Sequence, residues 1–473
     1  MPREAALDWL AKNEKRIISV SERIWELAEV GLQEHESSKL LVEEAGKAGF
    51  GVDLGVAGMP TAFVASYGVG KPVIGVLAEY DALPGVSQKA QPTREPVKKG
   101  APGHGCGHNL FGAGSLAAAV AIREAIERKG LKGTVKLFGC PAEETLVGKV
   151  FMARDGLFND VDVALSWHPA ACNSAWMSSS NALNSVKFNF HGLTSHAAAD
   201  PERGKSALDA VELMNVGSNY LREHISEKAR IHYVIPHGGG EPNVVPDYAQ
   251  VWYYVRAPRR NEVDRIYNRV VNIAKGACLM TDTTMDLEFL VGCYEMLPNK
   301  ALSELMISNM REVGPPKWSE EEHVFAKRLA GSMTEEERRD AILKSRMPKR
   351  EEKLEKYLDD TIEDPEDEKE VMGGSTDVGD VSWITPTANL VTATCVLGMP
   401  GHSWQETATS GMSIGHKGML LAAKTLALTG VDLITKTEEL KKIREEFQAK
   451  TRGVKYRTPI PAGQKPPLDQ LAH

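Results

Sequence analysis

The sequence predicts an α/β fold of two domains, in which a smaller domain interrupts a larger one. Over the first 180 residues helical and strand-like stretches alternate, as in a sheet covered by helices on both faces. After Asn181 apolar residues begin to alternate with polar ones, as in a strand with one buried face. An apolar strand and an apolar helix return after residue 297. At 473 residues the chain is also longer than one core usually supports.

The larger domain is expected to comprise residues 1–180 and 297–473 and to contain a largely parallel sheet. Periodicity predicts helices at 14–29, 37–48, 110–129, 148–155 and 413–429. It predicts strands at 72–81, 134–140, 161–167 and 389–397. Because open α/β sheets bind ligands beyond the carboxyl ends of their strands, we expect the chemistry at that edge.

The smaller domain is expected at residues 181–296. Its pattern predicts strand 185–191, helix 206–225, strands 230–235 and 248–257, helix 261–279 and strand 283–293. This βαββαβ order is that of a ferredoxin-like α+β unit. Its exposed sheet edge offers a surface for pairing with a second copy of the chain.

Residues 315–370 form an insertion crowded with charge, which includes the runs Glu320-Glu321-Glu322, Glu335-Glu336-Glu337 and Lys349-Arg350-Glu351-Glu352. Two interpretations remain open, a solvated helical insertion and a cap over the active site. The tail from Arg457 carries four prolines and is predicted to be a loosely packed extension.

Composition excludes several classes of function. The chain has 56 basic and 64 acidic side chains, a net charge of −8, which argues against a nucleic-acid partner. The sequence shows no apolar run near the roughly 18 residues that a membrane span needs, and no signal-peptide pattern at its start, so we expect no membrane partner. Six cysteines are too few for a disulfide scaffold, which favours a reducing cytoplasm.

Four separated segments place metal-binding side chains at the ends of predicted strands, which brings them to one edge of the sheet. The residues are Cys106 and His108 in a glycine-rich turn, Glu143 and Glu144 after a proline, His168, and His402. Any one of these would be weak, since an isolated strand-end histidine is more often structural. Their coincidence predicts a metal site.

Counting ligands suggests two metal ions that share a side chain. Leaving Glu143 aside gives five ligands, whereas two ions with about three protein ligands each need six. Thiolate and imidazole suit zinc, and a carboxylate-bearing pair also accepts manganese. Such a pair activates water and polarises a carbonyl, which leaves Glu143 free as general base.

These segments resemble the dinuclear-metal family of aminoacylases, carboxypeptidases and amino-acid amidohydrolases. The matching motifs are residues 79–84 (EYDALP), 105–109 (GCGHN), 143–144 and 195–198 (SHAA). Residues 103–109, 243–246, 375–383 and 416–424 are more narrowly similar to the branch that hydrolyses p-aminobenzoyl-glutamate, over nearly the whole chain.

The resemblance implies roles for the residues of the larger domain. It assigns Glu143 as the base and Cys106 as the bridging ligand, with Glu144 and His402 on one ion and His108 and His168 on the other. Many relatives have His-x-Asp where this chain has Glu79-Tyr80-Asp81, so only Asp81 is carried over, as an orienting residue.

For the smaller domain the resemblance implies a lid and a dimerisation surface. It implies that His196 reaches across a dimer interface to stabilise the tetrahedral oxyanion, that Asn243 holds the carbonyl, and that Arg256 grips the substrate carboxylate. A homodimer is expected, with a related partner subunit as the alternative.

The sequence therefore predicts a metal-dependent hydrolase that cleaves the amide bond of N-acyl or N-aroyl amino acids, first among them p-aminobenzoyl-glutamate. Indole-acetyl-aspartate is the alternative substrate. Two other classes remain open: a cysteine hydrolase that uses Cys106 and His108, and a non-catalytic metal-binding subunit of a hetero-oligomer.

Overall fold

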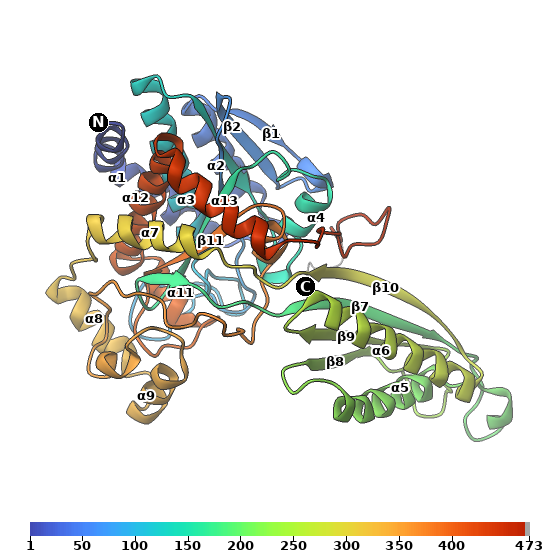
Figure 1. Ribbon diagram of the computed structural model, residues 1–473. Helices are drawn as coiled ribbons and strands as arrows, with labels where there is room; N and C mark the ends of the chain where they lie inside the picture. Colours follow the sequence, from blue (N-terminus) through green and yellow to red (C-terminus); the bar gives the residue numbers. More distant parts are fainter. Residues whose placement is uncertain (469–473) are drawn as a thin grey trace.

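A computed structural model describes residues 1–468, and the last five residues of the expected tail extension lie outside this range. Two sheets divide the chain, as Figure 1 shows. One has seven strands in the order β1-β2-β4-β3-β5-β11-β6, and the other has four in the order β10-β7-β9-β8. The α/β fold class is confirmed.

The centre of the seven-stranded sheet is parallel. Strands β4 (Gly133–Gly139), β3 (Val73–Ala78), β5 (Val163–Ala170) and β11 (Thr387–Ala393) run in one direction. Strands β1 (Gly51–Leu54), β2 (Phe63–Val69) and β6 (Ser174–Trp176) flank them through antiparallel pairings and were not predicted. All four parallel strands therefore present their carboxyl ends at one edge.

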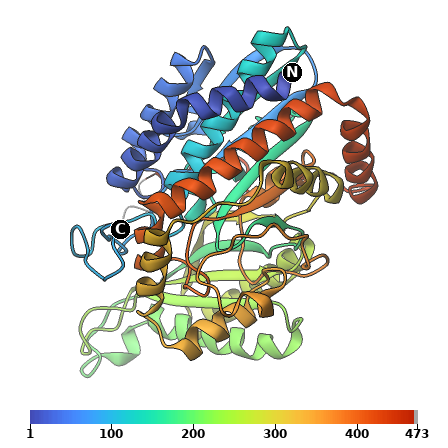
Figure 2. The ribbon, with the colours of Figure 1, turned by 90° about the vertical axis from the view of Figure 1, so that its left-hand side faces the viewer.

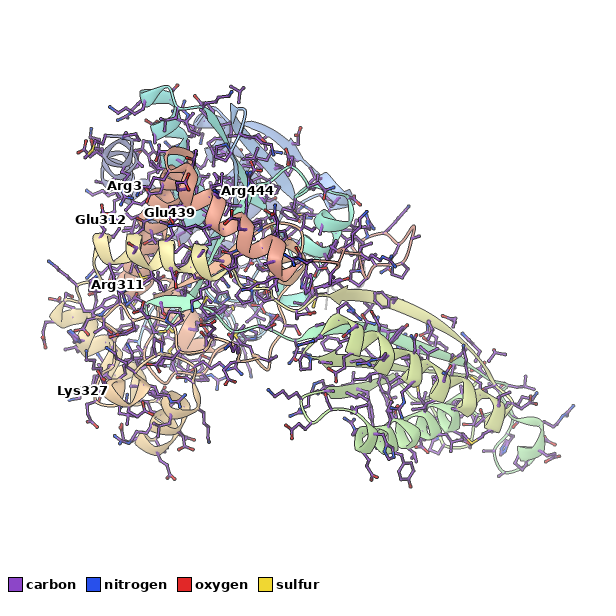
Figure 3. All side chains as sticks on the ribbon, viewed as in Figure 1. Arg3, Arg311, Glu312, Lys327, Glu439 and Arg444 are labelled. Carbon is purple, nitrogen blue, oxygen red and sulfur yellow. The ribbon has the colours of Figure 1, made fainter. Side chains whose placement is uncertain are left out.

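Helices cover both faces of this sheet. One face carries α1 (Pro2–Leu27), α2 (His35–Lys47), α3 (His108–Lys129), α7 (Lys300–Val313), α12 (Ser413–Thr435) and α13 (Thr437–Lys450). The other carries α4 (Gly148–Arg154) and α10 (Val378–Ser382). Figure 2 shows the long helices lying side by side over the sheet. Arg3 of α1 pairs with Asp432 of α12 and with Glu312 of α7, and Arg3 and Glu312 are labelled in Figure 3.

Helix α12 has the length and the apolar composition of a membrane span, with a mean hydropathy of 1.4. This corrects the expectation that no stretch is apolar enough. However, 83% of that window is buried inside the protein. The helix packs against α1, α3 and α7, and its composition follows from that central position in the core.

The four-stranded sheet belongs to the lid, the name used here for residues 181–296. It contains β7 (Ala182–His191), α5 (Ala207–Leu221), β8 (Arg230–His237), β9 (Tyr248–Ala257), α6 (Arg260–Thr281) and β10 (Thr284–Cys293). Every pairing is antiparallel, and both helices pack on one face. The lid projects away from the larger sheet, and β8 is an open edge (Figure 1).

The charged insertion is only partly solvated. It contains α8 (Glu320–Ala330) and α9 (Glu335–Lys344), with a buried ion pair of 2.6 Å between Lys353 and Asp359 behind them. Its inner side packs on the segment that leads to His402, where Leu397 donates its N–H to the Tyr357 carbonyl (2.9 Å). The insertion thus supports one rim of the sheet edge.

The proline-rich tail is more firmly packed than predicted. The Tyr456 hydroxyl donates to Asp380 (2.8 Å), and Ile460 is buried in the core on the α4 face. Gln464 donates to the carbonyl of Leu290 in β10 (3.0 Å). Ile460 and Gln464 lie between the prolines and explain this packing, because they tie the tail to the core on the α4 face and to the lid. Tyr456, just before the tail, makes the contact with α10.

Candidate metal centre

The edge at the carboxyl ends of β3, β4, β5 and β11 gathers all five predicted metal ligands. Nitrogen, sulfur or oxygen atoms of Cys106, His108 and His168 lie within 4.8 Å of one another. Those of Cys106, Glu144 and His402 do so as well. Cys106 is the residue common to both groups, and so two ions at this edge could share its sulfur.

A glycine-rich turn brings Cys106 and His108 to this edge. Gly107 has a φ of 72°, in the left-handed region that suits glycine, and α3 begins at the next residue, two positions earlier than predicted. The Cys106 Sγ lies 3.4 Å from Nε2 of His168. His168 lies within β5 near its end, rather than beyond the strand as predicted.

The imidazoles of His108 and His168 are each oriented by a partner on Nδ1. His108 Nδ1 lies 2.8 Å from Asp81 Oδ1, and His168 Nδ1 lies 2.7 Å from the Pro169 carbonyl. An N–H on each Nδ1 leaves each Nε2 free to bind a cation. Burial, followed by the charge of His108, lowers the pKa of His168 to about 3, which keeps that ring neutral as a metal ligand must be.

The carboxylate Glu144 and His402 form the exposed side of the site. His402 Nε2 lies 3.5 Å from Glu144 Oε2, and the His402 side chain is 60% exposed. His402 has a φ of 54°, a conformation that few non-glycine residues adopt. Burial raises the pKa of Glu144 to about 8, so a neighbouring cation would stabilise its ionised form.

The donor set fits divalent cations. Among the described residues, His108 Nε2 and Glu144 Oε1 are buried and make no hydrogen bond. A buried polar atom without a partner is costly, and cations bound at these two atoms would remove that cost. One thiol, three imidazoles and one carboxylate suit zinc, and the carboxylate also suits manganese.

Glu143 lies at the same site as Glu144 but has different neighbours. It is 8% exposed, and its Oε2 lies 4.0 Å from His108 Nε2. It precedes Glu144 in a short 3-10 turn, Glu143–Thr145, so the two carboxylates point in different directions. This separation allows one to bind a cation while its neighbour handles a proton.

A buried ion network behind the site was missed by the sequence analysis. Lys149 Nζ lies 2.7 Å from Glu79 and 2.6 Å from Asp377, and all three side chains are at most 1% exposed. Glu79 Oε2 is 3.3 Å from His108 Nε2, so Glu79 borders the metal site although it was not carried over as a site residue. A lysine in the apolar stretch around residue 149 was the available signal.

The three predicted lid residues lie apart from the metal edge. His196 and Asn243 are both exposed and adjoin one another, since Ala197 donates its N–H to the Asn243 carbonyl (2.9 Å). They follow the ends of β7 and β8 that point away from the larger sheet. Arg256 lies at the opposite end of β9, next to the crossing between the domains, so roughly 26 Å of strand separates the two groups.

Arg256 has a free donor in a partly buried position. Its Nε is buried and makes no hydrogen bond among residues 1–468, and its guanidinium lies 5.4 Å from the centre of the Tyr254 ring. A carboxylate could therefore pair with this guanidinium without displacing another partner.

Comparisons with known proteins agree with this architecture. The model of peptidase family M20/M25/M40 matches residues 75–426. A p-aminobenzoyl-glutamate hydrolase subunit from Escherichia coli K12 is 42% identical over 97% of both chains. A mouse Xaa-Arg dipeptidase is 29% identical over 92% of this chain and 90% of its own. A Bacillus subtilis M20 peptidase, described as dinuclear metal binding, has the same fold, with a TM-score of 0.56 and 15% identity over 90% and 99% of the two chains.

Proposed function

Because this chain belongs to peptidase family M20/M25/M40 and is a metallopeptidase-like amide hydrolase, we propose that it cleaves p-aminobenzoyl-glutamate into p-aminobenzoate and glutamate. The observation that carries the proposal is the pair of ligand groups sharing Cys106, with Glu143 as a further carboxylate 4.0 Å from His108. A relative of nearly equal length with a p-aminobenzoyl-glutamate hydrolase name supports this choice of substrate.

In this proposal two divalent ions, zinc or manganese, are held at the sheet edge. His108 and His168 would hold one ion, Glu144 and His402 would hold the other, and Cys106 would be a ligand common to the two groups. When bound, such ions supply Lewis-acid polarisation of the amide carbonyl and lower the pKa of water. Asp81 orients His108 through its 2.8 Å contact.

The remaining steps belong to side chains of the protein. Glu143 accepts the proton of the attacking water at a carboxylate oxygen and then delivers it to the nitrogen of the leaving amine. Glu143 also lies within 4.8 Å of Glu79 and His108. Because the two groups that share Cys106 already supply ligands for two ions, a proton-transfer role for Glu143 is the better supported one.

The lid residues complete the substrate site in two ways. Arg256, at the domain crossing with a free donor, binds the substrate carboxylate. His196 and Asn243, at the far end of the lid, act on the site of a second copy, where His196 stabilises the oxyanion and Asn243 holds the carbonyl. Their distance from the domain crossing supports action across an interface.

A homodimer formed through the lid supplies that second copy. The open edge strand β8 and the neighbouring helix α5 expose large apolar side chains: Val234 at 59%, Val216 at 49% and Tyr220 at 69%. An open edge next to exposed apolar groups favours pairing with another sheet edge. A related partner of a different sequence is the alternative, and the relative's name, which calls that protein one subunit of a hydrolase, supports it.

A reducing compartment such as the cytoplasm is the proposed location. All six cysteines are free thiols, and five of them are buried. Burial, followed by the Glu144 charge, raises the pKa of the Cys106 thiol above its usual value, which counts against a cysteine nucleophile at this site.

The decisive test is a hydrolysis screen with the purified chain alone, with and without added zinc or manganese. The substrates are p-aminobenzoyl-glutamate, indole-acetyl-aspartate and dipeptides that end in arginine. We expect the first to give the highest kcat/KM and chelation to abolish turnover. Preference for another substrate would overturn the specificity, and metal binding without any turnover would favour a non-catalytic subunit.

A further inference from the structure

The loop that carries Glu143 and Glu144 has an unusual backbone. It joins β4 to α4, and two of its non-glycine residues, Ala142 (φ 55°) and Leu146 (φ 62°), are left-handed. Its two ends nearly touch, since a Cβ on Gly148 would lie 2.0 Å from the Pro141 carbonyl oxygen. Such conformations cost free energy and persist only where surrounding contacts hold them.

Three buried carboxylates accept backbone N–H groups along this loop. Glu34 accepts from Ala142 at 2.8 Å, before the catalytic pair. Asp81 accepts from Glu144 at 3.0 Å, within the pair. Asp377 accepts from Lys149 at 2.8 Å, just after the loop.

These carboxylates come from remote parts of the chain and have little exposure. Glu34 precedes α2, Asp81 follows β3, and Asp377 precedes α10, and each is at most 1% exposed. Each also has a second donor or ionic partner on its other oxygen: the Thr61 hydroxyl for Glu34, His108 for Asp81, and the Lys149 ammonium for Asp377. A buried carboxylate with both oxygens engaged has one favourable orientation, so it can fix what it binds.

We propose that Glu34 and Asp377 are positioning residues which, together with Asp81, clamp the loop of residues 141–148 so that Glu143 and Glu144 face the metal edge. This inference rests on the roles of Glu143 and Glu144 in the proposed function. The clamp holds the loop before, within and after the catalytic pair.

Asp377, the carboxylate bound just after the loop, is also linked to the metal edge through a chain of ion pairs. Asp377 holds Lys149, Lys149 holds Glu79, and Glu79 borders His108. Helix α10, which begins directly after Asp377, also binds the segment that returns from the lid. Tyr294 donates its N–H to Asp380 (3.0 Å), and Leu297 donates its N–H to the Ser382 hydroxyl (2.9 Å). Loss of Asp377 therefore loosens the catalytic loop from both sides.

Isosteric variants separate geometry from charge. Asp377 accepts two hydrogen bonds, from the Lys149 N–H and from the Lys149 ammonium. In Asp377→Asn the new NH₂ group cannot accept, so it faces one of these donors and one of the two hydrogen bonds is lost. In Glu34→Gln the amide oxygen can still accept from Ala142 while the Thr61 hydroxyl turns to accept from the amide. Glu34→Ala removes the anchor altogether.

The experiment measures kcat, KM, metal content and amide hydrogen exchange of residues 140–150 in the metal-loaded protein. We expect Asp377→Asn and Glu34→Ala to lower kcat by roughly 10- to 100-fold with little change in KM, and to speed exchange of this peptide. Glu34→Gln should stay within about 3-fold of wild type, because it keeps the hydrogen bond. Glu446→Gln, at a carboxylate that accepts N–H groups of Lys300 and Ala301 far from the loop, is the matched control.

The outcomes decide the proposal in each case. Wild-type kcat and wild-type exchange in Glu34→Ala would overturn it, as would faster exchange spread over the whole protein with an equal loss in the Glu446 control. If Asp377→Asn fails to fold, the pair Glu34→Ala and Glu34→Gln gives the answer alone. If wild type hydrolyses nothing in the substrate screen, the proposed function fails, while exchange of residues 140–150 still tests the clamp.

Discussion

The metal edge and the far end of the lid differ in how they hold their functional side chains. At the edge, side chains from remote segments form two groups that share Cys106, and the ligand atoms within each group lie within 4.8 Å of one another. Two of the imidazoles are fixed by partners at 2.7 and 2.8 Å. At the lid end, His196 and Asn243 are exposed, and the contact between their segments runs through the backbone. In the proposed function, one chain therefore supplies the ligands for both ions, whereas His196 and Asn243 act on the site of a second copy.

The largest expected effect comes from the proton carrier at the metal edge. Glu143→Ala should lower kcat by about 10³- to 10⁴-fold while both ions stay bound, because the general base is lost and the ligands are not. Steady-state kinetics together with metal analysis measures both quantities. Loss of metal in this variant would show that Glu143 is a metal ligand. The assignment of Glu143 as base and Glu144 as ligand would then be wrong.

The second largest effect is expected at His196 of the lid, and mixing of subunits tests whether it acts on the site of a second copy. His196→Ala should lower kcat by about 10²- to 10³-fold, as expected for a lost oxyanion donor. Mixing it with inactive Glu143→Ala subunits should restore activity, since a mixed dimer contains one intact edge that faces one intact His196. No recovery in dimers shown to exchange subunits would place His196 on its own chain's site.

A good part of both regions could be predicted from the sequence. The ligand residues stood out because their types recur where strands end, and a sheet with parallel strands brings such ends together. The lid's βαββαβ order followed from its period-2 and helical patterns.

What the sequence could not give were contacts between residues far apart along the chain. Lys149 and Asp377 are 228 positions apart, so no local pattern pairs them. Strands β1 and β6 were not predicted because they have only four and three residues, too few to show a period. Strand β2 has seven residues but loses its buried pattern after the first three, next to the margin of the sheet. The residues Asn243 and Arg256 were assigned to one substrate site, but the direction of β9 places them at opposite ends of the lid sheet.

Arg256 should give a smaller and more selective effect. Arg256→Lys keeps the charge but loses the planar fork that grips a carboxylate with two hydrogen bonds. We expect KM for p-aminobenzoyl-glutamate to rise about 10-fold with kcat nearly unchanged. The control substrate has an amide in place of the α-carboxylate. An equal rise in KM for that substrate would show that Arg256 does not bind this group.

The smallest effect is expected where the insertion supports the metal edge. Gly398 has a φ of 81°, and a Cβ there would lie 2.7 Å from Arg338 Cγ. Gly398→Ala should lower the free energy of unfolding by about 1–3 kcal/mol, which thermal unfolding measures. It should also weaken metal binding at His402, which metal titration measures. Lys344→Ala, on the exposed face of α9, should change neither, and equal effects of the two variants would mean that the insertion does not support this edge.

The central claim is that one chain holds two cations around Cys106 and leaves Glu143 free. Anomalous diffraction from crystals loaded with zinc or manganese tests it directly. We expect two peaks about 3.5–4 Å apart on either side of the Cys106 sulfur, one against His108 and His168 and one against Glu144 and His402. A single peak, or a peak held by Glu79 or Glu143 without Cys106, would contradict the account.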